Sequence, residues 1–217
     1  MVLLFLTLNS SRAAARPSSC SSAYSATMPG VTRVRRQQQD SKGGMVPPSP
    51  LRDSILNAWA TNNRTTVFLI EQLPPVLWNA AVPGAPRRTV CMIGGHIHNA
   101  RCAWIKTLGR PHGISVPPSV DRRHVGRVEL IRALNRSGEG IASLLDFGCE
   151  RNGRIPPTAA YVWRNLPLDV GHVLAYFVAH EGHHRGQIVM LARQLGHRLP
   201  PAVTNGLWLW TKRSAEV

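Results

Sequence analysis

Residues 168–196 read "LDVGHVLAYFVAHEGHHRGQIVMLARQLG". The stretch predicts one long helix, because apolar residues such as Ala179 and Ile188 recur along it and Gly196 is a typical residue after a helix C-terminus. The histidines of "HEGHH" at 180–184 stand inside this otherwise apolar helix. The same stretch therefore bears on both the fold and the function.

Three further stretches have a helical pattern. They are residues 49–78, with Ser49 as a candidate N-cap and Pro50 at the first helical position; 89–109, with Thr89 as N-cap and Gly109 after the C-terminus; and 126–153. No segment has the pattern of a strand, and "PGAPRR" at 83–88 is expected to be a loop. Four helices joined by loops of moderate length predict an all-α four-helix bundle.

The chain is long enough, at 217 residues, for one well-buried domain and an extension. Residues 1–45 are rich in arginine and serine and have Asp40 as their first acid, so we expect a disordered basic extension. It is either a targeting segment or the product of an over-long gene model that truly starts at Met28 or Met45. Residues 46–217 form the expected domain. A cytoplasmic location is expected, or an organelle if the extension is a transit peptide.

The formal net charge is +15. Nearly all of the positive charge is arginine, scattered along the chain, which favours a coding bias and a basic tail over a nucleic-acid surface. Nucleic acid is therefore not an expected partner. No stretch is apolar enough to span a membrane, so a membrane is not an expected partner either. The four cysteines form no CxxC pair, which excludes a structural zinc ribbon.

Two histidines of the quoted helix have the spacing of metal ligands. His180 and His184 lie one turn apart and about 40° apart around the helix, so both imidazoles can bind one metal ion. His183 lies about 60° away from His180 on the other side and is a weaker candidate. Burying imidazoles without partners is costly, which favours a metal over a polar helix face.

A third ligand comes from the helix at 89–109. His96 and His98 are about 200° apart, so only one of them can face the core. His96 shares its side with the apolar residues Ile93 and Trp104, whereas His98 falls on the polar side with Arg101. We therefore predict His96, His180 and His184 as ligands, and a surface or loop-facing position for His98.

"HEGHH" also satisfies the HExxH pattern of zinc proteases, with Glu181 as general base. The required context is missing, because the only acid after Glu181 is Glu216 and no strand pattern precedes the helix. A metalloprotease is therefore disfavoured.

"HIHNARCAWI" at 96–105 and "HEGHHRGQIVMLARQLG" at 180–196 resemble the DinB-like (YfiT-like) family, the damage-inducible proteins. The resemblance extends over residues 47–212. It implies a four-helix bundle of up-down-down-up topology that binds a divalent metal, most often zinc or nickel, through His96, His180 and His184. It also implies that Arg185 and Gln187 support packing or the ligands. Relatives are often dimers, so a homodimer is one state to expect, but the sequence does not specify the oligomeric state.

Some members of the family are thiol S-transferases that use low-molecular-weight thiols. The resemblance thus implies a metal-dependent transferase that activates such a thiol for attack on a small electrophile. Glu181 is the candidate catalytic residue, acting as a base or orienting a ligand histidine. The alternatives are a metal-dependent hydrolase of a small substrate and a non-catalytic metal or stress-response binding protein. The substrate, the metal and the cofactor-binding residues are not specified by the sequence.

Overall fold

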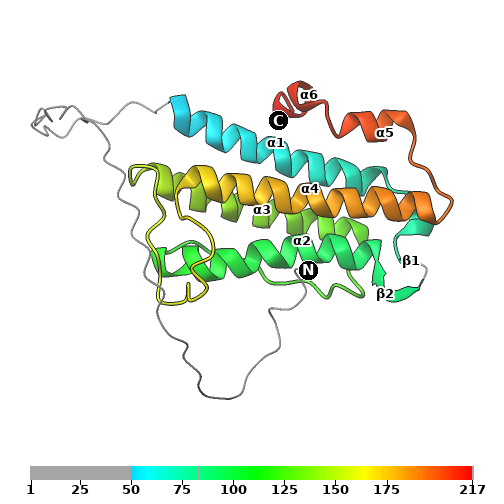
Figure 1. Ribbon diagram of the computed structural model, residues 1–217, viewed down its shortest axis with the longest axis horizontal. Coiled ribbons are helices and arrows are strands. Elements are labelled where there is room, and N and C mark those ends of the chain that lie inside the picture. Colours follow the sequence, from blue (N-terminus) through cyan, green and yellow to red (C-terminus); the bar gives the residue numbers. More distant parts are fainter. Residues whose placement is uncertain (1–49, 83, 217) are drawn as a thin grey trace, which may run out of the picture. The chain divides into compact units, whose positions relative to one another are not determined.

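Four long helices dominate the computed structural model, which describes residues 50–82 and 84–216 (Figure 1). They are α1 (Pro50–Gln72), α2 (Val90–Trp104), α3 (Arg127–Cys149) and α4 (Val170–Gln194). The all-α prediction is confirmed at this level. The extension at 1–45 and the proposed cap Ser49 lie outside the described residues.

The helix ends follow local capping chemistry. The Thr89 hydroxyl accepts a hydrogen bond from the Met92 amide at 3.1 Å, as predicted for the start of α2. Asp169 caps α4 in the same way by accepting from the His172 amide. Gly196 has φ 78°, so α4 ends on a left-handed glycine as predicted. These residues fix the start of α2 and both ends of α4, the two helices that carry the histidines.

The prediction that Gly109 ends the second helix is wrong. The chain continues from α2 through a π-helical turn, η2 (Ile105–Gly109), and a 3₁₀ turn, η3 (Arg110–His112), and the left-handed residue is Gly113, with φ 83°. Gly109 itself has a helical φ of −96°. A side chain there would lie 3.1 Å from Ile114, so this glycine allows close packing and does not reverse the chain.

A small hairpin occupies the stretch that was predicted to be a loop. Strand β1 (Ala81–Val82) pairs antiparallel with β2 (Ala85–Thr89), and Gly84 in the turn has φ 75°. β1 has only two residues, and β2 reads "APRRT", with a proline and no alternation of apolar and polar residues, so neither stretch has the pattern of a strand. The hairpin follows the 3₁₀ turn η1 (Pro75–Leu77) and delivers the chain to the Thr89 cap.

The core has two apolar clusters and a polar layer between them. One cluster contains Leu69, Ile97 and Ile188, and the other contains Trp59, Ile105 and Phe177. On each long helix the residues between the two clusters are buried and polar: Asn62, Thr65 and Thr66 on α1, His98 and Arg101 on α2, Ser137 on α3, and Glu181, His184 and Arg185 on α4. The polar layer lies at the level of the predicted histidine site.

Two short helices, α5 (Pro201–Gly206) and α6 (Trp210–Ser214), follow α4 (Figure 1). Helix α6 packs along α1, and Gly206 of α5 lies against Phe68 of α1. Arg64 donates to the Arg213 carbonyl oxygen at 2.6 Å, and the Arg213 guanidinium lies 3.9 Å from the centre of the Phe68 ring. Trp208 is 81% exposed and takes no part in this packing.

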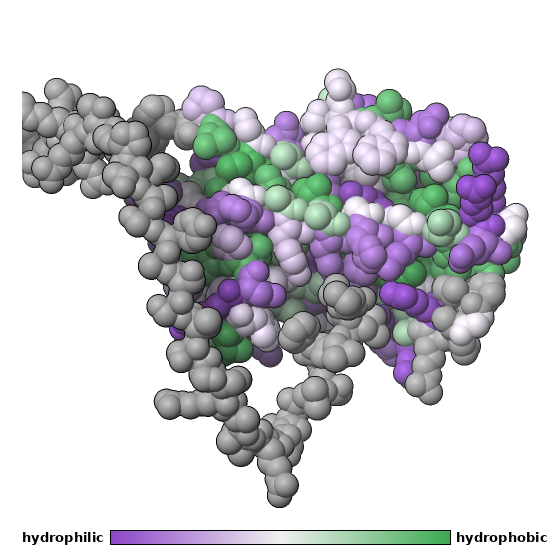
Figure 2. All heavy atoms as spheres, viewed as in Figure 1, coloured by the Kyte–Doolittle hydropathy of each residue, from purple (hydrophilic) through white to green (hydrophobic). Residues whose placement is uncertain are grey.

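The surface is mixed in character. On the face seen in Figure 2, hydrophilic residues alternate with apolar ones over the helices. Of the helices in the described residues, none combines the length and the apolarity needed to cross a membrane.

Candidate metal centre

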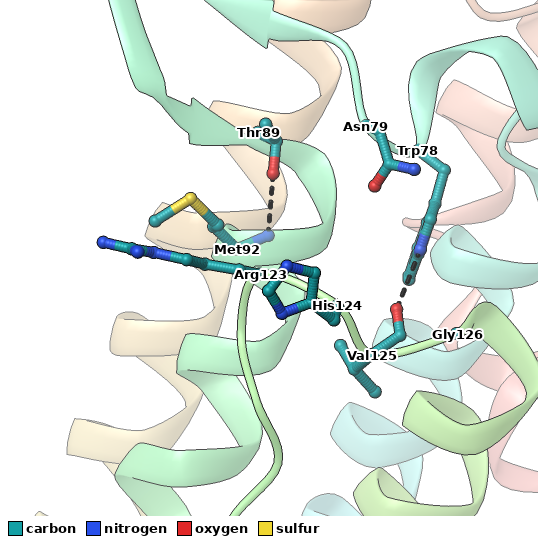
Figure 3. Close-up of a pocket in the computed structure, with 8 residues that line it drawn as sticks. All are labelled: Trp78, Asn79, Thr89, Met92, Arg123, His124, Val125 and Gly126. Atoms are coloured by element: carbon teal, nitrogen blue, oxygen red, sulfur yellow. Dashed lines mark hydrogen bonds between the residues drawn. The ribbon is translucent and has the colours of Figure 1, made fainter.

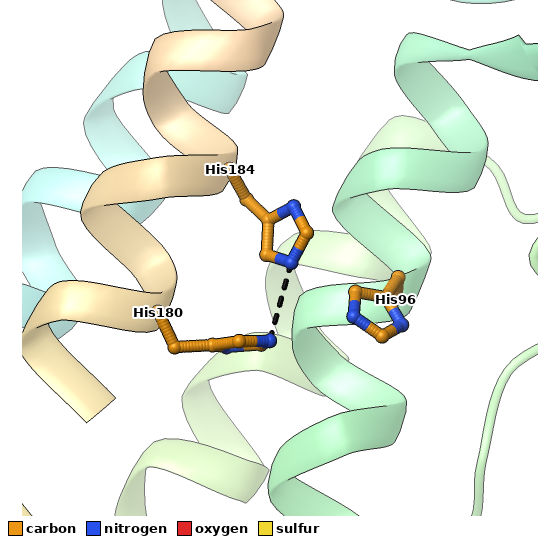
Figure 4. A group of neighbouring side chains, drawn as sticks. All are labelled: His96, His180 and His184. Carbon is orange, nitrogen blue, oxygen red and sulfur yellow. Dashed lines mark hydrogen bonds between the residues drawn. The ribbon is translucent and has the colours of Figure 1, made fainter. Parts of the chain in front are cut away.

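Three histidines meet in the space between α2 and α4 (Figure 4). One donor nitrogen of each of His96, His180 and His184 lies within 4.8 Å of the corresponding atoms of the other two. The ring of His96 is centred 4.7 Å from that of His184 and 5.4 Å from that of His180. The structure thus brings together the three residues that helix geometry selected.

The spacing of the donor atoms fits a metal ion. The Nε2 atoms of His180 and His184 are 3.2 Å apart. Two nitrogens bound tetrahedrally at zinc distances of 2.0–2.1 Å would be about 3.3 Å apart. No acid belongs to the group, and an all-imidazole set suits zinc, nickel, copper and iron. His180 and His184 therefore fit one divalent transition metal ion without rearrangement of α4, and His96 is the third imidazole of the group.

Gln187 orients one of the three rings. Its side-chain oxygen lies 2.9 Å from Nδ1 of His184, and its amide nitrogen lies 2.8 Å from Nε2 of His183. In the arrangement that satisfies both contacts, the Gln187 amide donates to His183 and its oxygen accepts from Nδ1–H of His184. The lone pair of His184 is then on Nε2, the atom that faces His180. His183 itself is exposed and does not join the group.

The three imidazoles are neutral near pH 7. Burial, with smaller effects from the charges of His184 and Arg122, lowers the pKa of His96 to about 4. Burial also lowers the pKa of His184 to about 4, although the hydrogen bond with Gln187 opposes the shift. It lowers the pKa of His180 against the effect of Glu181. A neutral imidazole is the form that binds a metal.

Glu181, the predicted catalytic residue, lies in the polar layer, fully buried and turned toward other helices. It forms a bidentate ion pair with Arg101 at 2.7 and 2.8 Å and accepts hydrogen bonds from Asn62 and Thr66, each at 2.9 Å. Burial raises the pKa of Glu181, but Arg101 outweighs it and the pKa is lowered. Within the described residues, no hydrogen bond joins this carboxylate to a histidine.

Arg185 belongs to the same polar layer. Its guanidinium donates to Asn62 at 2.9 Å and to Thr66 at 2.8 Å, and it lies 3.8 Å from Glu181. Adjacent residues of α4 therefore have different partners: His180 and His184 lie beside His96 of α2, Glu181 contacts Arg101 of α2 together with α1, and Arg185 contacts α1. Gln187 contacts a site histidine, and Arg185 does not.

The prediction of a surface position for His98 is wrong. His98 is fully buried; its Nδ1 lies 3.0 Å from the Ser137 hydroxyl, and its Nε2 lies 3.0 Å from the Pro118 carbonyl oxygen. The connector between η3 and α3 covers this side of α2, so both sides of the helix are buried. His98 does face a loop, as the prediction also allowed, but from inside the protein.

Sequence reasoning missed Arg101, which it assigned to the polar side. The side chain is 1% exposed because its charge is matched by Glu181, and its remaining donors bond to the Leu134 carbonyl oxygen and Asn63. An unpaired buried arginine would be too costly, so only the partner makes this position possible. The partner lies 80 residues away in the chain and leaves no local signal.

A separate pocket of about 570 Å³ lies where the start of α2 meets the loop before α3 (Figure 3). None of the three histidines lines it. Two of its polar groups are engaged in the local fold, since Thr89 caps α2 and the Trp78 indole donates to the Val125 carbonyl oxygen at 3.0 Å. The site formed by His96, His180 and His184 is therefore separate from this pocket.

Comparison of the chain with models of known protein families gives a match to the DinB family over residues 45–213. Comparisons with curated proteins and with solved structures gave no match. The matched segment contains all four long helices and the three histidines. Because the match covers well over half of the 217 residues, the chain belongs to the DinB family.

Proposed function

We propose that this protein binds one divalent metal ion, zinc or nickel, through His96, His180 and His184. With this ion bound, the protein would act as a thiol S-transferase. The observation that carries the proposal is the meeting of three neutral imidazoles, with the nitrogens of His180 and His184 3.2 Å apart and a nitrogen of His96 within 4.8 Å of both. Three protein ligands leave a coordination position for a substrate. A bound ion would supply Lewis acidity, which lowers the pKa of a thiol and so provides a thiolate near pH 7.

The reaction is a substitution at a small electrophile. The thiol sulfur forms a bond to the electrophilic carbon, the leaving group departs with the electron pair of its former bond, and the thiol proton passes to solvent. The protein's own residues hold the reactants. Gln187 keeps His184 in one orientation, and the partly buried rings limit the access of water.

Positive charge beside the histidines favours an anionic thiol or an acidic substrate. Arg122 packs against α2 next to His96, with its Cα 3.1 Å from the position of a Cβ on Gly95. The charges of Arg122 and Arg88 both act on His96. Neither arginine is paired with a carboxylate within the described part of the chain, so both are available to an anion.

The contacts of Glu181 support a positioning role more than a catalytic one. Its carboxylate is held by Arg101 and is fully buried, so a proton transfer would require this pair to open. General-base catalysis by Glu181 stays a prediction.

The YfiT-like subtype, a homodimer and a cytoplasmic location also stay predictions. We further infer a four-helix bundle of up-down-down-up topology, supported by α1 and α4 running one way in Figure 1 and α2 and α3 the other.

Two other functions use the same histidines. In a metal-dependent hydrolase the nucleophile would be water, and turnover would need metal but no added thiol. A non-catalytic metal or stress-response protein would bind the ion and turn over neither class of substrate.

Elemental analysis of the purified full-length protein tests the metal site. We expect about one equivalent of metal in the wild type and none in the His96→Ala/His180→Ala/His184→Ala variant. His183→Ala is the matched control, because His183 is on the same helix but exposed, and it should keep its metal. If the wild type takes up neither zinc nor nickel, the site is refuted.

The transferase has a separate test. The His180→Ala variant should lose metal-dependent thiol transfer, and unchanged turnover in this variant would contradict the mechanism.

A further inference from the structure

A row of aromatic rings leads away from the histidines along α4 and α2. Tyr176 on α4 is followed by Trp104 on α2, and Trp104 by Trp163 on the loop before α4. Successive ring centres are 5.3 and 6.3 Å apart, and both pairs meet edge to face, within the range of favourable aromatic contacts. We call Tyr176, Trp104 and Trp163 the aromatic row.

The aromatic row is continuous with the histidine cluster. The Tyr176 ring is stacked on His180, with ring centres 5.9 Å apart and an angle of 11° between the planes. Tyr176 precedes His180 by one helical turn, and Trp104 follows His96 by two, so the same faces of α4 and α2 carry both groups. A molecule lying on the row would have one end beside the three histidines.

The loop that carries Trp163 is fixed to the body of the protein. The Tyr161 hydroxyl donates to the Leu166 carbonyl oxygen at 2.8 Å and accepts from the Leu166 amide at 2.7 Å, which closes the turn around Trp163. Arg164 in this turn has φ 49°, an uncommon conformation for a residue with a side chain. Thr158 anchors the start of the loop to the Thr107 carbonyl oxygen at 2.6 Å.

The aromatic row exposes ring surface to solvent, although aromatic side chains are usually largely buried. Trp163 is 52% exposed, while Trp104 and Tyr176 are half-buried. Beneath them, Phe177 and Tyr161 are buried and support the row from inside. A hydrogen-bonded loop that holds a tryptophan open to solvent, at the end of a row of rings that begins next to His180, is suited to contact a ligand.

We propose that the aromatic row binds a planar, conjugated group of the electrophilic substrate, and thereby holds its reactive carbon at the histidine cluster. The inference rests on the proposed function, because it names the substrate class of that site. Flat π-systems stack on or meet the edges of aromatic rings, whereas a puckered saturated ring of similar volume gains only the burial of its apolar surface. The row therefore selects substrates by planarity.

Calorimetric titration of the zinc-loaded full-length protein with two matched probes tests this inference. The probes are 2-naphthoate and its saturated analogue decahydro-2-naphthoate, which share the carboxylate and the carbon skeleton. We expect 2-naphthoate to bind roughly three- to tenfold more tightly. Trp163→Leu should reduce this ratio by at least half, and Trp163→Phe should restore most of it.

Trp208→Leu is the matched control, since Trp208 is also an exposed tryptophan but packs in no aromatic row, and it should leave the ratio unchanged. Tyr176→Leu, checked first for metal content, is an independent second variant and should also reduce the ratio. Equal affinities of the two probes for the wild type would overturn the inference, as would a ratio that survives both Trp163→Leu and Tyr176→Leu. Either result would be expected if the aromatic row contacts a protein partner and not a small planar ligand.

The two proposals fail separately. A planarity preference that depends on Trp163, in a protein without thiol-transfer activity, would refute the transferase and keep the row as a ligand site. Thiol transfer that proceeds equally well on planar and on puckered electrophiles would do the opposite.

Discussion

Gln187 connects a histidine inside the site with one outside it. It holds His184 through Nδ1 and His183 through Nε2, so the buried ring is tied to the exposed one. Partners of this kind fix the tautomer and the orientation of a ligand histidine. The side chain touches no other histidine of the cluster, and its effect on a metal would pass through His184 alone.

Replacing Gln187 by alanine should weaken metal binding about 10- to 100-fold without unfolding the protein. The reason is that the His184 ring loses its fixed orientation and its preferred tautomer. Competition with a zinc-binding chromophore would measure the dissociation constant. Gln194→Ala, on the same helix and exposed, should bind zinc like the wild type. A dissociation constant that is the same in both variants would remove Gln187 from the site.

At the scale of elements, the Arg101–Glu181 pair joins α2 to α4. Both helices carry site histidines: Arg101 lies five residues after His96, and Glu181 lies directly after His180. A bidentate pair tolerates little sliding or rotation. The pair therefore fixes how the two faces that carry the histidines are aligned.

Arg101→Met should destabilise the metal-free protein by about 3–5 kcal/mol, because Glu181 would be left as a buried charge without its main partner. Combining it with Glu181→Gln removes that charge, so we expect the double variant to be more stable than Arg101→Met alone. Urea unfolding of the wild type, both single variants and the double variant measures the coupling. Additive effects in this cycle would show that the pair is not a unit.

The N-terminus of α4 gives a pH-dependent prediction. The hydrogen bond from the His172 amide lowers the pKa of Asp169 below its ordinary value of 3.8. Because the folded-state pKa is the lower one, the cap contributes its full stability above the ordinary pKa of 3.8, and this contribution is lost as the pH falls through the folded-state pKa. The difference in urea midpoint between wild type and Asp169→Ala should thus be constant near neutral pH and shrink below about pH 4. A difference independent of pH would contradict this.

Helical periodicity was enough to locate the long helices, but not to tell which of their faces are covered. The caps Thr89 and Gly196 are local chemistry, and both predictions are confirmed. His98 and Arg101 were placed on a polar side because their burial depends on Pro118 and Glu181, which are distant in sequence. The choice of His96 over His98 followed from the apolar residues on its own side of the helix.

At the scale of the whole molecule, the site exists only when the chain is folded. His96 and His180 are 84 residues apart in the sequence and meet because α2 and α4 pack together. A ligand that binds the folded state alone stabilises it by about 2.7 kcal/mol at 100 times its dissociation constant. Zinc should therefore raise the melting temperature of the wild type, and a chelator should reverse the change.

The triple-alanine variant provides the reference for that experiment, and its melting temperature should not respond to zinc. A wild type that melts at the same temperature with zinc and with chelator would argue against binding to the folded state.

On α4, His180 and His184 belong to the histidine site, whereas their neighbours Glu181 and Arg185 bond to other helices. This separation affects how the protein can evolve. The hydrogen bonds that join Glu181 and Arg185 to Asn62, Thr66 and Arg101 involve none of the three site histidines. Mutation can therefore alter or erase the metal site while the scaffold persists. Lineages that share this architecture are free to exchange ligands, change metals or lose the chemistry altogether, and a designer could do the same.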